Sequence, residues 1–304
     1  MNINSSRSRR EFLSAVAATW AALSAAGVGA EALPETRPSC KIIAFSKPFQ
    51  KATPALTADI VAEVGWDGIE CPVRAMGQIE PERVEEELPK MVEALRKVGR
   101  EVTIITTDIK GVNALNEKVL RTASALGIKR YRLGFWHYED SKSIPEQIAE
   151  IRDAMHELTA LNKALGLTGA YQNHSGAKMF GAGVWDIYDA MKDCDPKQMG
   201  ICFDIGHATI EGGLSWPITA RLMRPFYAAV FVKDFAWQKG PKGWIPQWCP
   251  LGEGTIDPRF FRTLKQSNYD GPICQHFEYP VREGAAMIGA MKKDLTVLKQ
   301  WLAD

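Results

Sequence analysis

The sequence lacks a dominant charge, a close cysteine pair and, beyond its first 30 residues, any long apolar run. It has 37 Lys and Arg against 36 Asp and Glu, a formal net charge of +1. This balance gives no reason to expect a nucleic-acid partner, and without a long apolar run we expect no stable membrane association once the N-terminal segment is removed. The six cysteines form no C-x-x-C pair. We expect mainly buried free thiols, with a disulfide from Cys40 as the alternative.

The N-terminus carries an Arg-rich start, a short apolar segment and then small residues. Its stretch Ser8-Arg9-Arg10-Glu11-Phe12-Leu13 resembles a twin-arginine export signal. We therefore predict a cleaved signal peptide over residues 1–30, a Pro-containing linker over 31–38, and a periplasmic or otherwise extracytoplasmic location. An amphipathic surface helix or a membrane anchor is the alternative interpretation of the first segment.

From residue 39 to residue 304 the chain alternates strand-like and helix-like segments eight times. The predicted strands cover 41–45, 66–71, 101–107, 129–136, 167–172, 199–204, 227–234 and 272–279. The predicted helices cover 56–65, 81–99, 112–127, 144–166, 184–193, 214–223, 257–268 and 283–302. Eight such units in about 265 residues predict a single-domain (β/α)₈ TIM barrel.

Two local features favour a barrel over an open doubly wound sheet. Four helices end in a glycine just before a strand, at Gly65, Gly99, Gly127 and Gly166, as helices with left-handed caps do. The segment after the first strand, AFSKPFQKAT, has no Gly-rich phosphate turn, which the open sheet usually carries.

Polar residues gather at the ends of the predicted strands, where the function of a barrel sits. Because alternate strand residues share a face, the pattern predicts that several sets point inward together. These sets are Ala170, Gln172 and His174; Cys202 and Asp204, with His207 just beyond; Phe231 and Lys233; and Cys274, His276 and Glu278. Glu70 ends the second strand and His137 ends the fourth.

Four of the five histidines fall at these strand ends, and His156 lies on a helix. Imidazoles together with Asp204 and Glu278 suit one divalent metal ion, Mn²⁺, Mg²⁺, Co²⁺ or Zn²⁺. Each acid lies near the end of an apolar strand, where an unpaired charge is costly. For either acid the alternative is a buried pair with Lys233.

At these residues the chain resembles the xylose isomerase-like TIM-barrel superfamily, the sugar phosphate isomerase/epimerase group. The motifs that carry the resemblance are YQNHSG, CFDIGHATIEGG, VFVKDF, PLGEGTID and GPICQHFEY, in family order, with GWDGIEC and LRKVGREVTIITTDI extending it into the first half. The resemblance implies an enzyme, a barrel fold and possible homo-oligomers. It does not fix the substrate, because the fold hosts many activities.

The resemblance also implies a metal held by Glu, Asp, His and Glu from strands five to eight. Asp204 and Glu278 match this set, whereas Gln172 and Phe231 stand where a Glu and a His are expected. Two readings stay open: the metal remains, bound by Gln172, Asp204, Glu278 and an imidazole such as His207, or Lys233 takes over the cationic role.

The change at Gln172 bears on mechanism, because an amide cannot titrate. A symmetric reaction with two Glu bases is therefore not expected. We predict proton abstraction beside a carbonyl by Glu278 or His174, with a metal or Lys233 stabilising the enediolate. A leaving group β to the carbonyl would turn the same apparatus to elimination, as in dehydratases and keto-glycoside lyases.

The expected substrate is a non-phosphorylated carbohydrate, because sugar phosphates are scarce outside the cytoplasm and no Arg cluster is visible in the sequence. We expect Glu70, His137, His276 and Glu253 to bind it, with Trp136 and Trp237 stacking on a sugar face. Ordinary loop packing is the alternative for the tryptophans. A non-catalytic sugar-binding barrel and an endonuclease IV-like phosphodiesterase are the other functions considered.

Overall fold

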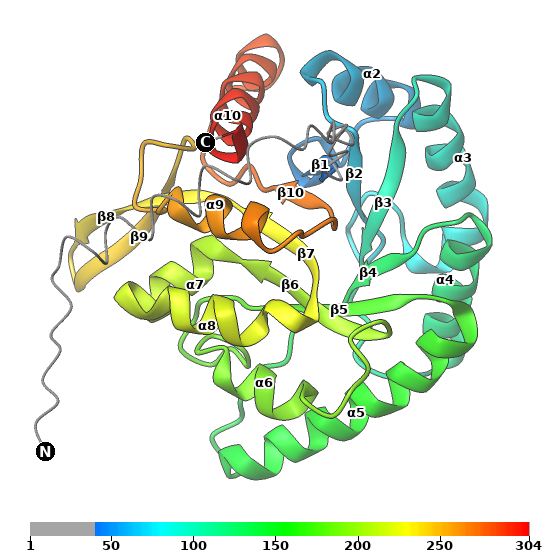
Figure 1. The fold of residues 1–304 in the computed structure, drawn as a ribbon. Coiled ribbons are helices and arrows are strands. Elements are labelled where there is room, and N and C mark those ends of the chain that lie inside the picture. Colours follow the sequence, from blue (N-terminus) through cyan, green and yellow to red (C-terminus); the bar gives the residue numbers. More distant parts are fainter. Residues whose placement is uncertain (1–39, 304) are drawn as a thin grey trace, which may run out of the picture. The chain divides into compact units, whose positions relative to one another are not determined.

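The computed structural model describes residues 40–303, so the predicted signal over 1–30 and the linker over 31–38 lie outside the described residues. Eight parallel strands close into a barrel in the order β1-β10-β7-β6-β5-β4-β3-β2, and the predicted TIM-barrel fold is confirmed (Figure 1). The strands are β1 (Ile42–Phe45), β2 (Gly68–Pro72), β3 (Glu101–Thr106), β4 (Arg130–Arg132), β5 (Thr168–Gln172), β6 (Met199–Asp204), β7 (Tyr227–Val232) and β10 (Ile273–Gln275).

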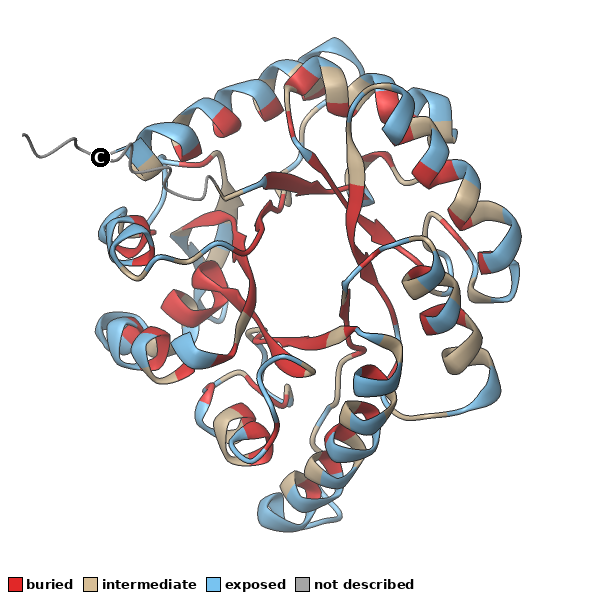
Figure 2. Ribbon diagram, turned by 45° about the vertical axis from the view of Figure 1, so that its right-hand side comes forward, coloured by how far each residue is buried: buried red, intermediate tan, exposed pale blue. Residues whose placement is uncertain are grey.

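Helices surround the barrel, with buried residues on the faces that they turn toward the strands and exposed residues outward (Figure 2). They are α2 (Pro54–Val64), α3 (Val84–Lys97), α4 (Ala114–Ala125), α5 (Ile144–Leu165), α6 (Trp185–Met191), α7 (Ile205–Gly212), α8 (Trp216–Met223), α9 (Arg259–Gln266) and α10 (Ala285–Ala303). Short 3₁₀ turns, η1 (Lys47–Phe49), η2 (Pro81–Arg83), η3 (Gly213–Ser215) and η4 (Arg224–Phe226), join them.

The predicted glycine caps are present. Gly65 and Gly166 have φ of 94° and 65° and donate their N–H groups to Val61 and Asn162 of the helices that they end. Gly99 and Gly127 also have positive φ. A side chain is disfavoured in this conformation, so glycine lets each helix turn at once into the next strand.

Two barrel strands are shorter than the sequence predicts. The fourth and eighth strands, β4 and β10, end at Arg132 and Gln275, short of the predicted 136 and 279. His137 and Glu278 therefore lie in the loops that follow them.

Two further elements differ from the sequence prediction. Helix α7 begins directly after β6, because the Asp204 side chain caps it by accepting the N–H of His207. Its two glycines and short length hide it from the periodic pattern. The long segment after the seventh strand forms an antiparallel hairpin, β8 (Asp234–Gly240) paired with β9 (Gly243–Cys249).

The barrel interior holds its own apolar cluster beneath the strand ends. Its members are Ile43, Phe45, Ile104, Ala170, Cys202, Ala228, Ala229, Phe231 and Cys274. A larger apolar cluster lies between the strands and the helices. All six cysteines are free thiols. Among the described helices, none combines the length and apolar character needed to cross a bilayer.

Candidate active site at the carboxyl end of the barrel

A layer of charged and polar side chains lies above the interior apolar cluster. Its members come from six strands or strand ends and are at most 4% exposed: Glu70, Arg132, Gln172, Asp204, Lys233 and His276. The inward alternation predicted for strands five to eight thus brings Gln172, Asp204, Lys233 and His276 into one layer. Buried groups of this kind require partners, and each has one.

The centre of this layer is an ion pair between Asp204, at the end of β6, and Lys233, just after β7. The Lys233 Nζ lies 3.1 Å from the Asp204 Oδ2. Burial by itself would raise the Asp204 pKa, but the charge of Lys233 and the neighbouring His207 hold that pKa well below its usual range. Asp204 is therefore a carboxylate, and Lys233 is the fixed cation that compensates it.

Gln172 joins this pair to a second cation. Its Nε2 donates to the Asp204 Oδ2 at 2.7 Å, and its Oε1 accepts a hydrogen bond from the Arg132 guanidinium. A guanidinium only donates, so the amide orientation is fixed. Next to Gln172, Asn173 exchanges two hydrogen bonds with the backbone of Asp204, at 2.9 and 2.8 Å. Both side chains therefore hold the end of β6 in place.

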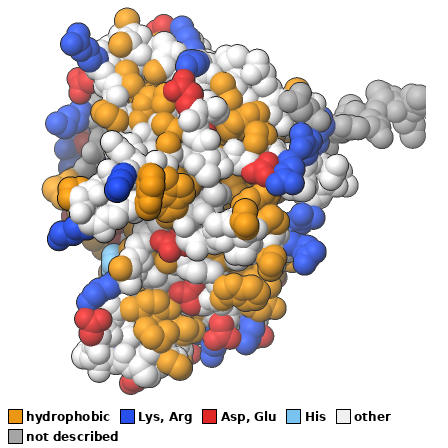
Figure 3. Space-filling view, turned by 90° about the vertical axis from the view of Figure 1, so that its left-hand side faces the viewer, with side chains coloured by type: hydrophobic (Ala, Val, Ile, Leu, Met, Phe, Trp, Pro, Cys, Tyr) orange, Lys and Arg blue, Asp and Glu red, His pale blue; other side chains and the backbone are white. Residues whose placement is uncertain are grey.

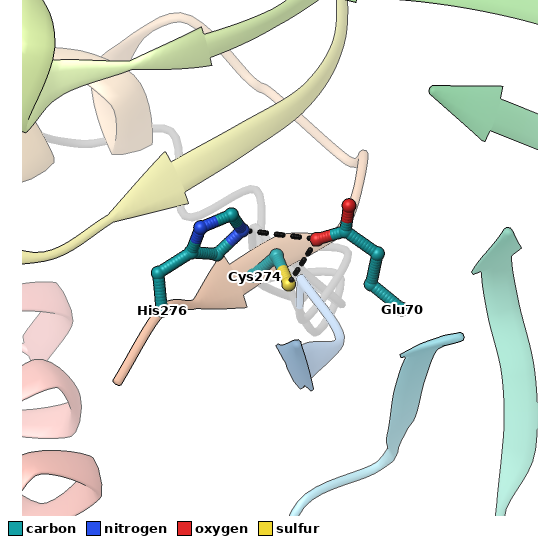
Figure 4. A group of neighbouring side chains, drawn as sticks. All are labelled: Glu70, Cys274 and His276. Atoms are coloured by element: carbon teal, nitrogen blue, oxygen red, sulfur yellow. Dashed lines mark hydrogen bonds and ion pairs between the residues drawn. The ribbon is translucent and has the colours of Figure 1, made fainter. Parts of the chain in front are cut away.

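Glu70 organises the opposite side of the layer. In Figure 4 Glu70, Cys274 and His276 point toward one another. The Glu70 Oε2 accepts from the His276 Nε2 at 2.9 Å and from the Cys274 thiol at 3.2 Å, while Thr106 donates to Oε1. Burial would raise the Glu70 pKa, but His276 and then Arg132, whose Nε lies 3.5 Å away, lower it to about 2.

The four predicted metal ligands are not arranged around one point. Gln172 turns its oxygen to Arg132, and Asp204 is paired with the Lys233 ammonium. Within residues 40–303, the group of His, Cys, Asp and Glu side chains close enough to hold a metal is Glu70, Cys274 and His276, which excludes Glu278 and His207. The predicted set therefore does not fit a divalent ion in this arrangement.

Carboxylate, thiol and imidazole are donor types that suit Zn²⁺, so the group around Glu70 is a possible metal site. In the structure its donors are occupied, however. Both Cys274 and His276 hydrogen-bond Glu70, and Arg132 already neutralises that carboxylate. Burial and the Glu70 charge raise the pKa of the Cys274 thiol well above its usual value. A dication here would have to displace both hydrogen bonds beside a guanidinium.

His174 and His207 form a second functional group beyond β5 and β6, with ring centroids 3.8 Å apart. The His174 Nδ1 lies 2.9 Å from the Ser175 carbonyl oxygen, which can only accept, so Nδ1 carries the proton and Nε2 keeps its lone pair. Burial and then the charge of Lys233 lower the His174 pKa to about 4. His174 is therefore a neutral imidazole with a free basic nitrogen at neutral pH.

His207 offers an unpartnered atom in the same place. Its Nδ1 lies 2.8 Å from the Ser175 Oγ, while its Nε2 is buried with no hydrogen-bond partner among the described residues. A buried polar atom without a partner is unfavourable in the free protein. The Asp204 Oδ2 lies 3.8 Å from this nitrogen.

Glu278 lies three residues beyond β10, at the edge of the layer. Its Oε1 is 3.8 Å from the Lys233 Nζ, and its Oε2 is 3.5 Å from the Lys47 Nζ. Burial would raise its pKa, but Lys233 and other cations lower it. Glu278 is thus a carboxylate near the same ammonium that Asp204 holds.

The remaining predicted substrate residues do not join this layer. Trp136 packs against Tyr171 and Phe180, and His137 is exposed. Trp237 is 44% exposed on the hairpin, and Glu253 pairs with Lys293 at 2.6 Å on the surface. From the hairpin, Trp248 does reach the site, since the Lys233 Nζ lies 4.9 Å from its ring centroid. On the face that the hairpin turns outward, hydrophobic side chains lie in separate exposed patches (Figure 3).

Asp234 fixes the polypeptide directly after Lys233. Its carboxylate accepts the backbone N–H groups of Phe235, Gly252, Gly254, Thr255 and Ile256, at 2.8 to 3.1 Å. The side chain therefore clamps the segment after β9 against the start of β8.

Two arginines at the site, Arg132 and Arg74, were not predicted from the sequence. Arg132 is 4% exposed and touches both Glu70 and Gln172. The signal was available, since Arg130 and Arg132 alternate along a predicted strand as inward residues do. Arg74 lies in the turn after β2, where no periodic pattern indicates direction.

Solved structures with the same fold include a sugar epimerase and a dehydratase. The 3-keto-D-glucoside 4-epimerase of E. coli has 17% identity and a TM-score of 0.67, covering 86% of this chain and 100% of that chain. The probable 3-DHS dehydratase of Bacillus anthracis has 14% identity and a TM-score of 0.62, covering 85% and 98%.

A third similar structure, a xylose isomerase-like TIM barrel protein from Mycobacterium smegmatis, was solved in complex with magnesium. It has 15% identity and a TM-score of 0.64, covering 87% of this chain and 97% of that chain. No curated protein matches the chain by sequence. The family model for the xylose isomerase-like TIM barrel matches residues 58–301. The chain therefore belongs to the xylose isomerase-like TIM barrel family.

Proposed function

We propose that the protein is a sugar isomerase or epimerase that removes a proton next to a carbonyl group of a non-phosphorylated carbohydrate. The observation that carries this proposal is a neutral imidazole, His174, whose pKa is lowered by burial and by the charge of Lys233, a buried ammonium that two carboxylates hold in place. A base and a fixed cation are the two elements that formation of an enediolate requires.

His174 takes the proton in this mechanism. Its Nε2 lone pair removes the proton from the carbon next to the carbonyl, and the C–H electron pair forms the C=C bond of an enediolate. The carbonyl π electrons move to oxygen, whose negative charge the Lys233 ammonium stabilises. Transfer of the hydroxyl proton to the other enediolate oxygen, with return of a proton from His174 to the former carbonyl carbon, gives an isomer. Protonation of the original carbon on its opposite face, by Glu278 after it takes a proton from solvent, gives an epimer, and His174 then releases its proton to solvent.

Lys233 acts as an ammonium rather than as an amine nucleophile. Its Nζ lies 3.1 Å from the Asp204 carboxylate and 3.8 Å from the Glu278 carboxylate, so it forms ion pairs with both. Borohydride treatment in the presence of substrate tests this point, since it traps a lysine imine as a stable mass increase. We expect no such adduct.

Elimination is the second candidate function, favoured by the same base and cation and by the similar structure of a dehydratase. A sugar with a leaving group β to its carbonyl would lose that group from the enediolate. Incubation with keto-glycosides separates the two reactions, because elimination releases the aglycone and isomerisation or epimerisation retains it.

Exchange of the substrate proton with solvent tests the proposed function without knowledge of the product. Ketoses and keto-glycosides are incubated with the protein in D₂O, and NMR follows deuterium at the carbon next to the carbonyl. We expect protein-dependent exchange with at least one sugar. Tight sugar binding without exchange would instead support the non-catalytic sugar-binding barrel.

Metal removal is expected to leave the exchange rate unchanged, because Lys233 and Arg132 occupy the positions of positive charge at the site. The purified protein is dialysed against EDTA, its metal content is measured, and exchange is assayed with and without Mn²⁺, Mg²⁺, Co²⁺ or Zn²⁺. Loss of exchange after dialysis, with recovery on adding one of these ions, would contradict this and support the metal-assisted reading.

Export by the twin-arginine route is proposed from Ser8-Arg9-Arg10-Glu11-Phe12-Leu13 alone. Residues 1–38 fused to a reporter should direct it out of the bacterial cytoplasm. A fusion in which Arg9 and Arg10 are both replaced by lysine should retain it there. Equal export of both fusions would overturn this location.

A further inference from the structure

A cation at the mouth of the barrel has no part in the mechanism above. Arg74 lies in a tight turn between β2 and η2, and the backbone of this turn is fixed. The Arg74 N–H donates to the Ile79 carbonyl at 3.1 Å, and the Gly77 N–H donates to the Arg74 carbonyl at 2.8 Å. The Gln78 side chain ties the turn to Ser46 and Thr57. The position of Arg74 is therefore set before any ligand arrives.

The guanidinium of Arg74 reaches over the barrel interior. Its Cζ lies 5.9 Å from the ring centroid of Phe45, and the Cζ of Arg132 lies 5.8 Å from the same ring. That ring in turn stacks on His276 at 4.8 Å. Arg74 and Arg132 thus approach one aromatic side chain at the end of β1, next to the charged layer.

Arg74 differs from the other cations of the site in its partners. Arg132 pairs with Glu70, Lys233 with Asp204, and Lys47 with Glu278. Within residues 40–303, no carboxylate oxygen lies within 4.0 Å of the Arg74 nitrogens. Asp108, Glu70 and Glu278 attract it only from farther away.

The surroundings of Arg74 also favour the binding of a negatively charged group. The side chain is half-buried, and burial followed by the charge of Arg132 lowers its pKa. A partly desolvated cation beside another cation gains from a negative partner. Among the described residues, Arg74 is therefore a cation near the charged layer that lacks a carboxylate in direct contact, with Asp108 exerting the largest attraction of those farther away.

The turn around Arg74 suits a carboxylate better than a phosphate. Phosphate sites commonly use several free backbone N–H groups. Here the N–H groups of Arg74, Met76, Gly77, Gln78 and Ile79 all donate within the protein. A guanidinium can bind either anion through its parallel N–H donors, and without supporting backbone N–H groups a single guanidinium best balances the single charge of a carboxylate.

We propose that the substrate is a sugar acid whose carboxylate binds the guanidinium of Arg74. This inference rests on the proposed function, since it adds the class of sugar on which the same site acts. No Arg cluster is visible in the sequence, but the fold brings together Arg74, which follows β2, and Arg132, which ends β4.

Three ketoses that differ at one carbon test the proposal: D-fructose, D-fructuronate and D-fructose 6-phosphate. We expect the highest kcat/KM for deuterium exchange with the carboxylate sugar. Arg74→Met should lower that kcat/KM by about 10- to 100-fold, as loss of a charged hydrogen bond does, and leave the value for D-fructose nearly unchanged. Arg83→Met, a matched change at an exposed arginine that pairs with Glu87, is the control.

Equal use of all three sugars, a preference for the phosphate, or an equal effect of Arg74→Met on each would overturn the proposal. Failure of the proposed function is distinguishable, because no sugar would then exchange its proton. In that event calorimetry with D-fructuronate still decides, since the wild-type protein should bind it and Arg74→Met should not.

Discussion

Replacing Lys233 by methionine is expected to lower the free energy of unfolding by about 3–5 kcal/mol, because it leaves the Asp204 carboxylate buried without its cation. Both side chains are at most 4% exposed, so water cannot replace the lost partner. The same change should slow solvent exchange by about 10²–10³-fold, the usual cost of removing one fixed group that stabilises a developing oxyanion. Urea denaturation and the NMR exchange assay measure the two effects.

A second substitution separates stability from catalysis. The double variant Lys233→Met/Asp204→Asn removes both charges and keeps an oxygen that can cap α7, so it should regain most of the lost stability. Its activity should stay low, because the ammonium is still missing. Lys192→Met, at an exposed lysine paired with Asp189, should leave stability nearly unchanged, because water screens exposed ion pairs. A double variant with near wild-type activity would remove Lys233 from the mechanism.

Replacing His174 by asparagine is expected to slow exchange by about 10²–10⁴-fold, the usual contribution of a general base. The Asn amide can still donate to the Ser175 carbonyl in place of Nδ1. It has no counterpart of the basic Nε2, so the loss should appear in kcat more than in KM. Replacing His156, which lies on α5, by asparagine is the matched control and should leave kcat unchanged.

The pH dependence supplies an independent readout for His174. A base with a pKa of about 4 is unprotonated at neutral pH, so the rate should be level above this value and fall below it. The lowered pKa also affects stability. Between the ordinary value of 6.5 and about 4 the unfolded chain binds the proton and the folded chain does not, so stability falls as pH falls through this range.

His174→Asn should make the dependence of stability on pH less steep between these two values. Measurement of denaturation midpoints across this range tests it. Suppose that neither the slope of stability against pH nor kcat changes in this variant. His174 would then not be a buried neutral imidazole and would not take the proton, and Glu278 would be the remaining candidate for the base.

Much of the barrel was predictable from local pattern. The strands are short, rich in β-branched residues and separated by amphipathic helices that end in glycine, and each of these signals is local in sequence. The inward alternation of Asp204, Lys233 and His276 followed from strand geometry alone. Helix α7 was missed because its start depends on a side-chain cap rather than on periodicity.

The partners within the site were not predictable in the same way. Sequence spacing brings Gln172 and Asp204 to the same end of the barrel, but it does not tell which way an amide turns. Arg132 decides that orientation from a neighbouring strand. Likewise Glu70 meets Cys274 and His276 only because β1 lies between β2 and β10 in the closed sheet. Ring closure joins residues about 200 positions apart, and no local pattern encodes their pairing.

The hydrogen bonds between Asp234 and the segment after β9 bear on how far the hairpin can vary in length and sequence. After Lys233 the chain forms the antiparallel hairpin of β8 and β9. The segment that follows β9 is then hydrogen-bonded to Asp234, at the first residue of the hairpin. The two ends of the hairpin are thus held together independently of its outer part. The outer part of the hairpin can therefore change in length and sequence while its base, where Trp248 lies against Lys233, keeps its position.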